Sequence, residues 1–312
     1  MNSGPSNLPI ESAGARPEKE PPRASARLSD YLELTKPRLS LLSVLTAFVG
    51  YFAARPAHDP LRVVFLAAGT CLAAGGVAAL NQWMEAGTDA RMRRTAERPL
   101  PTGRIADGSA FVMGWLMCVV ALMLTFAKVG KLPALFMLLT IASYLGCYTP
   151  AKRFTRWSTE IGAVAGAFPP LIGWSAAEGR VSSLGWILFG ILFFWQIPHF
   201  MAIAWIYRRD YSAVNFPMLP VLDQTGVRVA RWSAVAALLL VLVTLLPYPL
   251  GLASPWYAAA AALLGAWFLR RAVDFLRPVE RDAAARRLFL YTLAYLPLLL
   301  GSLVADRLLI SR

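Results

Sequence analysis

Residues 63–89 read VVFLAAGTCLAAGGVAALNQWMEAGTD, an uncharged apolar run that ends in Asn81, Glu85 and Asp89. A transmembrane helix needs about 20 apolar residues to cross the hydrocarbon core. Further charge-free runs recur along the chain, at residues 39–54, 108–127, 132–151, 161–177, 181–207, 232–269 and 288–305. The sequence therefore predicts a bundle of membrane-spanning helices, one of which carries polar groups at its end.

The composition supports this class. Of the 312 residues, 57% are hydrophobic and 16% are charged, which implies more apolar surface than a soluble protein of this size can bury. The run at 232–269 is too long for one helix, and its Pro and Gly residues divide it into spans near 230–246 and 255–270. We expect an all-α fold with nine transmembrane helices, because only helices or closed barrels satisfy their backbone in lipid and these runs are too long for barrel strands.

Lys and Arg set the orientation. With nine spans, most of the 31 Lys and Arg residues fall on the side of the N-terminus, and the positive-inside rule places that side in the cytoplasm. The expected location is a bacterial plasma (inner) membrane. Membrane lipid is the expected surrounding partner, and nucleic acid is not, because the basic residues are scattered through the loops. Residues 1–30 are polar and Pro-rich, which predicts a disordered cytoplasmic tail before the nine-helix domain at 31–312. At the end of the short first run, Lys36 is expected to snorkel to the interface.

Asn81, Glu85 and Asp89 are spaced i, i+4, i+8, which places them on one face of a helix. Carboxylate and amide oxygens suit Mg²⁺, and Arg94 and Arg98, which follow directly, suit phosphate. The alternative is an ordinary charged loop with surface ion pairs. Polar groups directly after an unbroken apolar helix are expensive and usually functional, so we favour a site for a metal and a pyrophosphate.

Two more segments carry polar residues. In YTPAKRFTRWSTEIG, residues 148–162, Lys152 and Arg153 face the same compartment as the first loop, although the positive-inside rule alone would also account for them. Gln196 and His199 lie in an apolar span that Asp210 follows. A lone intramembrane histidine is either structural or orients a bound cofactor. Asp210 either joins the site or pairs with a neighbouring arginine.

Three motifs together resemble the intramembrane polyprenyltransferases of the UbiA-like superfamily, and within it the branch that farnesylates heme. The resemblance covers residues 29–306. Its motifs are Asn81-x3-Glu85-x3-Asp89 with Met92, Arg94-Thr95 and Arg98-Pro99; Tyr148-Thr149, Lys152-Arg153 and Thr155 with Gly166-Ala167, Pro169-Pro170 and Gly173-Trp174; and Trp195-Gln196, Pro198-His199-Phe200, Asp210-Tyr211 and Pro217-Met218-Leu219-Pro220. The chain departs from the family pattern at Ser158, where Asn is usual, and at Val214 and Asn215, where Ala and Gly are usual.

The resemblance implies transfer of a farnesyl group from farnesyl diphosphate to a vinyl group of heme B (protoheme IX), with addition of water, to give heme O. It implies Mg²⁺ as the cofactor and a heme A synthase or a cytochrome oxidase assembly factor as a downstream partner. The metal ligands would be Asn81, Glu85, Asp89 and Asp210. The catalytic residues would be Asn81, Glu85, Asp89, Arg94, Arg98, Lys152, Arg153, His199 and Asp210, and the residues that bind the acceptor would be Tyr148, Trp195, Gln196 and His199.

Two other functions compete with this interpretation. A quinone-type or chlorophyll-type ring could accept the prenyl group by the same chemistry. Quinone-prenylating relatives, however, carry a second set of spaced acidic residues like Asn81, Glu85 and Asp89, in the loop after the sixth span. In that loop this chain has only Asp210, with Asp223 further on. A small-molecule transporter would place its site near the midplane on broken helices, whereas most of the charged candidates here collect at one face. Both observations favour the heme prenyltransferase.

Overall fold

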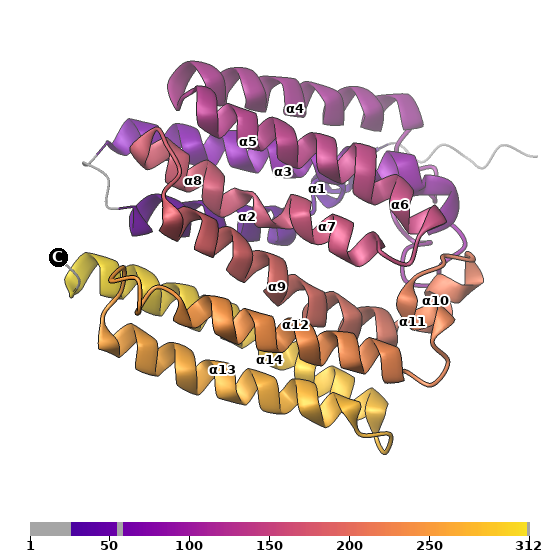
Figure 1. Cartoon of the computed structure of the whole chain (residues 1–312). Helices are drawn as coiled ribbons and strands as arrows, with labels where there is room; N and C mark the ends of the chain where they lie inside the picture. Colours follow the sequence, from indigo (N-terminus) through magenta and orange to yellow (C-terminus); the bar gives the residue numbers. More distant parts are fainter. Residues whose placement is uncertain (1–25, 55–58, 311–312) are drawn as a thin grey trace, which may run out of the picture.

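The computed structural model describes residues 26–54 and 59–310, and within these ranges the chain is helical and has no β-strand. The first half comprises α1 (Leu28–Leu34), α2 (Pro37–Ala53), α3 (Pro60–Asp89), α4 (Asp107–Lys128), α5 (Lys131–Ala142), the π-helix η1 (Ser143–Tyr148), α6 (Thr149–Phe154), α7 (Ser158–Ala167) and α8 (Pro169–Glu178). The second half comprises α9 (Ser183–Ile206), α10 (Arg208–Ala213), α11 (Leu219–Leu222), α12 (Val227–Leu245), α13 (Pro255–Leu276) and α14 (Arg281–Leu309). Figure 1 shows the long helices side by side, with α6, α10 and α11 at the end opposite the C-terminus.

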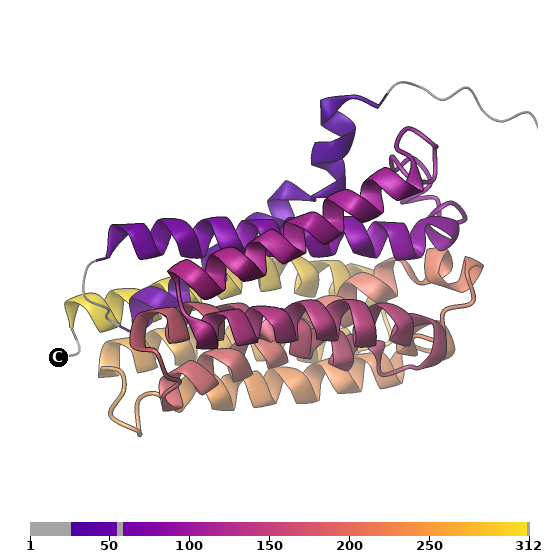
Figure 2. The ribbon, with the colours of Figure 1, turned by 90° about the horizontal axis from the view of Figure 1, so that it is seen from above.

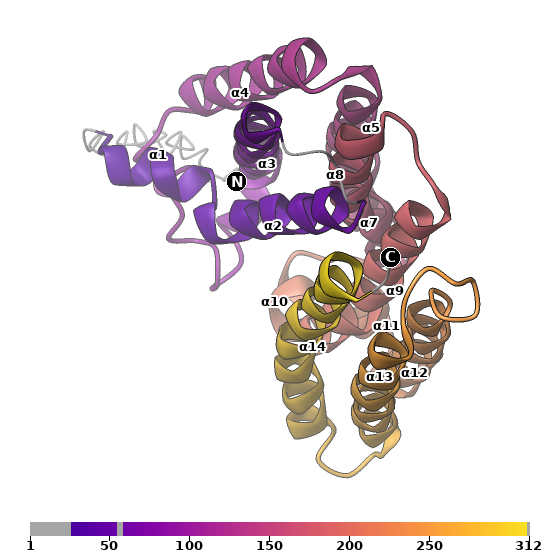
Figure 3. The same cartoon turned by 90° about the vertical axis from the view of Figure 1, so that its left-hand side faces the viewer.

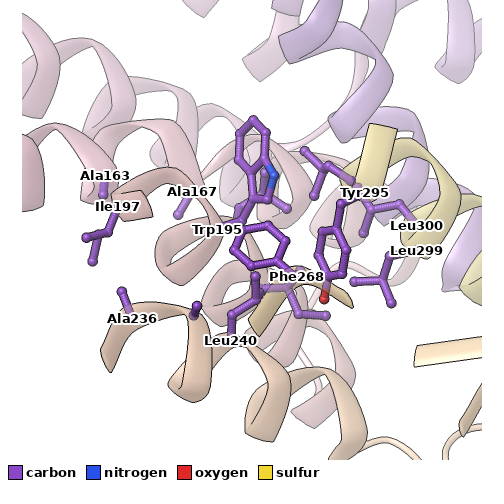
Figure 4. Close-up of a cluster of buried hydrophobic side chains, with 14 of the residues drawn as sticks. Ala163, Ala167, Trp195, Ile197, Ala236, Leu240, Phe268, Tyr295, Leu299 and Leu300 are labelled. Atoms are coloured by element: carbon purple, nitrogen blue, oxygen red, sulfur yellow. The ribbon is translucent and has the colours of Figure 1, made fainter. Parts of the chain in front are cut away.

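Two groups of helices make up the bundle. Viewed along its axis (Figure 3), α2–α8 form one group, and α9 with α12–α14 form the other. The groups are joined because α2 packs against α3, α8 and α14, while α9 packs against α7, α12 and α14. In the largest hydrophobic cluster, which contains residues of both groups (Figure 4), the rings of Trp195, Phe268 and Tyr295 lie together, and the small side chains of Ala167 and Ala236 belong to the same cluster. Small residues let helices approach closely, which drives packing where lipid is as apolar as the side chains.

Six helical segments among the described residues are long and apolar enough to cross a membrane: α3, α4, Lys131–Phe154, α9, α12 and α14. The expectation of nine spans is therefore not confirmed. α2 is apolar but has only 17 residues, and α13 carries charged residues in its last two turns. α7 and α8 are two short helices, because Pro169 and Pro170 interrupt the chain as predicted. The predicted division of the 232–269 run is confirmed, since α12 ends at Leu245 and α13 begins at Pro255.

The helix α1 corrects the expected boundary of the disordered tail. It begins at Leu28, so residues 28–30 are helical, whereas residues 1–25 of the expected tail lie outside the described part. The carboxylate of Asp30 accepts a hydrogen bond from the Arg27 amide at 2.9 Å and pairs with Arg104 in the loop at 90–106. Figure 2 shows α1 projecting from the bundle at the same end as the loop that follows α3. The buried acid Asp30 thus stabilises α1 against that loop.

Two glycines bring α2 and α8 into direct backbone contact. A Cβ atom at Gly173 would lie 1.7 Å from the carbonyl oxygen of Ala47, and one at Gly50 would lie 2.0 Å from that of Pro170. A backbone carbonyl cannot move aside by rotating a side chain, so both positions require glycine for the helices to pack at this distance.

We expect Gly173→Ala to lower the free energy of unfolding by about 1–3 kcal/mol or more, because one methyl group must push two helix backbones apart. Gly301→Ala on α14 is the matched control. No atom lies within 4 Å of a Cβ built there, and alanine is favoured over glycine in a helix by roughly 0.5–1 kcal/mol. Thermal unfolding in detergent, followed by tryptophan fluorescence, measures both. Equal melting temperatures for Gly173→Ala and the natural chain would contradict this packing.

Candidate active site

The three ladder residues, Asn81, Glu85 and Asp89, lie on the last turns of α3 and are buried, with 3%, 6% and 1% of their surface exposed. The Asn81 amide donates from Nδ2 to Glu85 Oε2 and to Thr149 Oγ1, each at 3.1 Å. Asn81 and Glu85 therefore meet on one face of α3, beside the start of α6. Because Asn81 donates through Nδ2, its Oδ1 is left available as a ligand.

Each buried carboxylate of the ladder pairs with a cation from a different loop. Lys152 on α6 places Nζ 2.8 Å from Glu85 Oε1 and 3.1 Å from Oε2. Arg98, in the loop at 90–106, places NH1 2.6 Å from Asp89 Oδ2. A buried charge is tolerated only when it is paired, so these two ion pairs bring both predicted anion-binding loops to the end of α3.

Arg94 and Arg153 point to other partners. Arg94 donates from NH2 to the Tyr211 hydroxyl at 3.3 Å, and its guanidinium lies 5.0 Å from the centre of the Tyr207 ring. Arg153 donates from NH2 to the Met84 carbonyl at 2.9 Å and is exposed. Arg94 thus links the loop after α3 to the segment after α9, and Arg153 holds α6 against α3. Both remain near the ladder without pairing with it in the structure.

Apolar residues stabilise the contact between these two segments. Met92 packs with Ala204, Val214, Phe216 and Met218 in a small buried cluster. The neighbouring Asn215 has φ of 55°, in the left-handed region that glycine, asparagine and aspartate tolerate best. This conformation gives a physical reason for asparagine at a position where the family pattern has glycine.

The predicted role of Asp210 as a metal ligand stays a prediction. Among the described residues, no group of three or more His, Cys, Asp and Glu side chains is arranged to hold a metal ion. The ladder supplies two carboxylates and one amide oxygen. This set suits Mg²⁺, which keeps several waters and takes further oxygens from a phosphate substrate. The donors of the ladder therefore fit Mg²⁺ when it arrives with a diphosphate.

The expected acceptor-binding residues on α9 form a second group that faces α7 and α14. His199 Nδ1 lies 2.7 Å from Thr292 Oγ1, and its ring stacks on Trp195 with 4.8 Å between the ring centres. The Trp195 indole donates to the Thr292 carbonyl at 2.9 Å. The Gln196 amide donates to the carbonyls of Ala163 and Leu192 at 3.3 and 3.0 Å. Trp195 and Gln196 thus have structural partners that fix α9 in place.

The tautomer of His199 is coupled to the hydroxyl of Thr292. Thr292 Oγ1 lies within hydrogen-bond distance of His199 Nδ1 and, at 2.6 Å, of the Phe289 carbonyl. When the hydroxyl donates to that carbonyl, it accepts from the imidazole, and in that tautomer Nδ1 carries the proton and Nε2 keeps a lone pair. An imidazole held in this way has the form that ligates metals in proteins.

Lys36, at the start of α2, is a site residue that the sequence interpretation assigned to the interface. Its backbone is left-handed, with φ of 46° and ψ of 60°, directly before Pro37. That conformation is unfavourable for a residue with a side chain and for one that precedes proline. The side chain is partly buried and turns inward to line the cavity beneath the ladder. In the sequence, only the pair Lys36-Pro37 could have indicated this inward position. A lysine that snorkels to the interface at a helix end has the same sequence pattern.

The charges around Lys36 come from the ladder and from the cations that pair with it. Burial, assisted by the positive charges of Arg98 and Lys152 and opposed by Glu85 and Asp89, lowers the pKa of Lys36 from 10.5 to about 7. The ammonium is therefore held close to its titration point at neutral pH. A bound anion would favour its charged form.

An apolar cavity of about 170 Å³ lies below the ladder and is lined by residues of α2, α3, α5, η1, α7 and α8. Lys36 and Tyr144 line the end that is nearer to the ladder, and Thr70 and Met137 line the far end. Tyr144 and Tyr148 belong to η1, and their rings meet edge to face at 5.0 Å. A π-helix is rare and often marks a functional site, but no pattern in the sequence distinguishes it from an α-helix. Tyr148 was expected in the site, whereas Tyr144 was missed.

The family model described as the UbiA prenyltransferase family matches residues 43–293. Protoheme IX farnesyltransferase of Opitutus terrae is 64% identical over 287 residues, which cover 92% of this chain and 97% of that protein. The enzyme of the same name from Solibacter usitatus is 41% identical over 291 residues, which cover 90% and 99% of the two chains.

Solved structures share the fold at low identity. A digeranylgeranylglyceryl phosphate synthase is similar with a TM-score of 0.77 at 15% identity, covering 90% of this chain and 98% of that one. A UbiA homolog from Archaeoglobus fulgidus bound to GPP and Mg²⁺ is similar with a TM-score of 0.61 at 13% identity, covering 88% and 99%.

We expect Lys36→Met to raise the melting temperature in detergent, and to raise it more at pH 6.5 than at pH 9.5. Because the folded pKa is lowered to about 7, the unfolded chain binds more protons between about pH 7 and the ordinary lysine pKa of about 10.4. The natural chain therefore gains stability as pH rises through this window, and the variant does not. Arg38→Met, which alters an exposed neighbour, is the control. A pH-independent difference between Lys36→Met and the natural chain would contradict the inward position of Lys36.

Proposed function

The chain belongs to the UbiA prenyltransferase family, and we propose that it is a Mg²⁺-dependent protoheme IX farnesyltransferase. It transfers the farnesyl group of farnesyl diphosphate to a vinyl group of heme B and, with addition of water, gives heme O. The observation that carries the proposal is the buried ladder of α3, paired with cations from two loops and placed directly above an apolar cavity. The 64% identity to a relative of that name supports heme B as the acceptor.

The two ion pairs of the ladder provide both halves of a diphosphate site. Glu85, Asp89 and Asn81 Oδ1 would ligate the metal, which supplies Lewis-acid stabilisation of the departing diphosphate. Lys152 and Arg98, released from the carboxylates, would then bind diphosphate oxygens. Arg94 could swing from Tyr211 to a third position on the same anion. This exchange keeps every buried charge paired, so it avoids the cost of an isolated charge in the membrane.

The boundary between the ladder and the cavity is where the prenyl group would react. The C1–O bond of farnesyl diphosphate breaks with its electron pair leaving on the diphosphate, and the π electrons of the vinyl group form the new bond to the allylic cation. Water then adds to the other vinyl carbon, which carries the positive charge, and gives up a proton to leave a hydroxyl group. The Tyr148 ring already accepts a cation, since Lys152 Nζ lies 4.5 Å from its centre. The rings of Tyr148 and Tyr144 present π-faces that favour positive charge, and the apolar walls exclude bulk water.

The membrane arrangement follows from the same proposal. We place the N-terminus and the ladder in the cytoplasmic leaflet of a bacterial inner membrane, with nine spans formed by α2, α3, α4, Lys131–Phe154, α7 with α8, α9, α12, α13 and α14. The support is the distribution of Lys and Arg over the loops and the six segments that meet the length and hydropathy of a span. A heme A synthase or an oxidase assembly factor is the downstream partner proposed from the family.

The direct test is to incubate the purified protein with heme B, Mg²⁺ and prenyl diphosphates, and to weigh the product. A product whose mass exceeds that of heme B by one farnesyl group and one hydroxyl group, since the added water gives up a proton, supports the proposal. An aromatic acid or a chlorophyll-type ring offered in place of heme tests the alternative acceptors. Prenylation of one of these with no reaction of heme would overturn the assignment of the acceptor while leaving the family chemistry intact.

Alanine at Asn81, Glu85 or Asp89 should reduce turnover by at least about 100-fold, comparable to the loss of one group that stabilises transition-state charge. The protein should still insert, because the changes lie at a helix end. Asp107→Ala is the control, since this exposed acid begins α4 close to the loop at 90–106. Initial rates across a Mg²⁺ titration measure the effect. Unchanged Mg²⁺ dependence in all three variants would remove the metal assignment.

His199→Ala should lose farnesylation of heme and keep the binding of farnesyl diphosphate, because Nε2 is the free nitrogen that would hold the heme ring. The absorption spectrum of bound heme should change if Nε2 ligates iron. Thr292→Val supplies a graded comparison: it removes the hydroxyl to which the tautomer is coupled and should weaken heme binding less than His199→Ala does. Full activity together with an unchanged heme spectrum in His199→Ala would return the residue to a structural role.

A further inference from the structure

We propose that Met137 closes the far end of the apolar cavity and so determines the length of prenyl chain that the enzyme accepts. This inference rests on the proposed function, because it concerns the tail of the prenyl diphosphate whose head binds at the ladder. It assigns a specificity role to a residue of α5 that makes no contact with the diphosphate site.

One face of α3 connects the ladder to the bottom of the cavity. Thr70, Ala73, Ala74, Val77 and Ala78 line the cavity, and their spacing of three and four residues continues into Asn81 and Glu85. Residues at this spacing share one face of a helix. A prenyl chain whose diphosphate is held at the ladder would therefore run down a stripe of mostly small residues toward Thr70.

The length of this stripe matches three isoprene units. The rise of an α-helix is about 1.5 Å per residue, which places Thr70 roughly 16 Å below Asn81. An extended chain advances about 1.2 Å per covalent bond, as the extended polypeptide backbone does, so one isoprene unit needs about 5 Å and a farnesyl chain about 14 Å. A fourth unit would have to pass Thr70 and enter the packed core beyond it.

Met137 blocks that passage. It is completely buried, and its sulfur lies 3.5 Å from the Thr125 hydroxyl of α4. A Cβ at Gly69 would lie 3.5 Å from Met137 Cε and 2.3 Å from Thr125 Oγ1. The side chain of Met137 is therefore held in a fixed position where α3 and α4 approach each other.

The residues packed beyond Met137 do not line the cavity. Leu66, one turn past Thr70 on α3, is completely buried in the same hydrophobic cluster as Met137, together with Phe136 and Leu171. Removing the end of the Met137 side chain should extend the cavity by roughly the space of a few methylene groups, whereas shortening Leu66 should open a void that the chain does not reach.

The test measures the affinity and turnover of geranyl, farnesyl and geranylgeranyl diphosphate with Mg²⁺. For Met137→Ala, we expect kcat/KM for the geranylgeranyl substrate, relative to the farnesyl substrate, to rise by about 10-fold or more, the discrimination that a methylene-sized change gives in an apolar pocket. For Ala74→Leu, which fills the stripe one turn above Thr70, we expect the preference to move toward the geranyl substrate.

Two variants serve as controls. Met137→Leu conserves the volume and should keep the farnesyl preference. Leu66→Ala removes the same kind of apolar bulk from the same cluster and should leave the order of the three substrates unchanged. Dissociation constants of the three diphosphates, measured with Mg²⁺ and no heme, test the inference separately from the acceptor.

The outcomes separate this inference from the proposed function. If Met137→Ala and Ala74→Leu both bind the three diphosphates in the natural order, Met137 does not determine the chain length, even when the natural chain prenylates heme. If the natural chain prefers the farnesyl diphosphate but never prenylates heme, the proposed acceptor is wrong. The order of affinities of each variant for the three diphosphates still tests the role of Met137.

Discussion

The structure depends on the burial of two carboxylates at the end of an apolar helix. Glu85 and Asp89 are at least 94% covered, and each would be strongly unfavourable there without a positive partner. The partners come from outside α3: Lys152 from α6 and Arg98 from the loop at 90–106. The pairing requirement therefore brings three separate segments to one place. The same arrangement can bind a metal and an anion. A metal ion would replace Lys152 and Arg98 as the partner of the carboxylates, and an anion would replace the carboxylates as the partner of these two cations.

The remaining architecture positions this site and shields it. The loop after α3 is fixed to the segment after α9 by Arg94 and by the small apolar cluster around Met92, which covers the end of the bundle. The helices α2 and α8 meet at Gly50 and Gly173, and this close contact brings α7 and α8 to the wall of the cavity. The polar ladder and the apolar cavity thus lie along one face of α3. One helix can therefore contact both the diphosphate and the apolar chain of an amphipathic substrate.

Much of the site could be predicted because its chemistry is local in the sequence. The spacing of Asn81, Glu85 and Asp89 defines one helix face wherever the helix packs, and basic residues that follow membrane spans face a known side. The predictions were less complete where a residue depends on its neighbours in space. Lys36 turns inward through an unusual backbone conformation, and Tyr144 enters the site through a π-helix.

The sequence by itself determined the class of the protein, the positions of most helices, the break at Pro169 and Pro170, and the polar ladder, because hydrophobic runs, prolines and helical spacing act over a few residues. Only the tertiary structure decided which cation pairs with which carboxylate, which side chains line the cavity, and that Nδ1 of His199 lies next to Thr292. The physical reason is that ion pairing, cavity shape and hydrogen bonding depend on distances between helices that are far apart in the chain. These distances are determined by the packing of small residues and by the need to pair every buried charge.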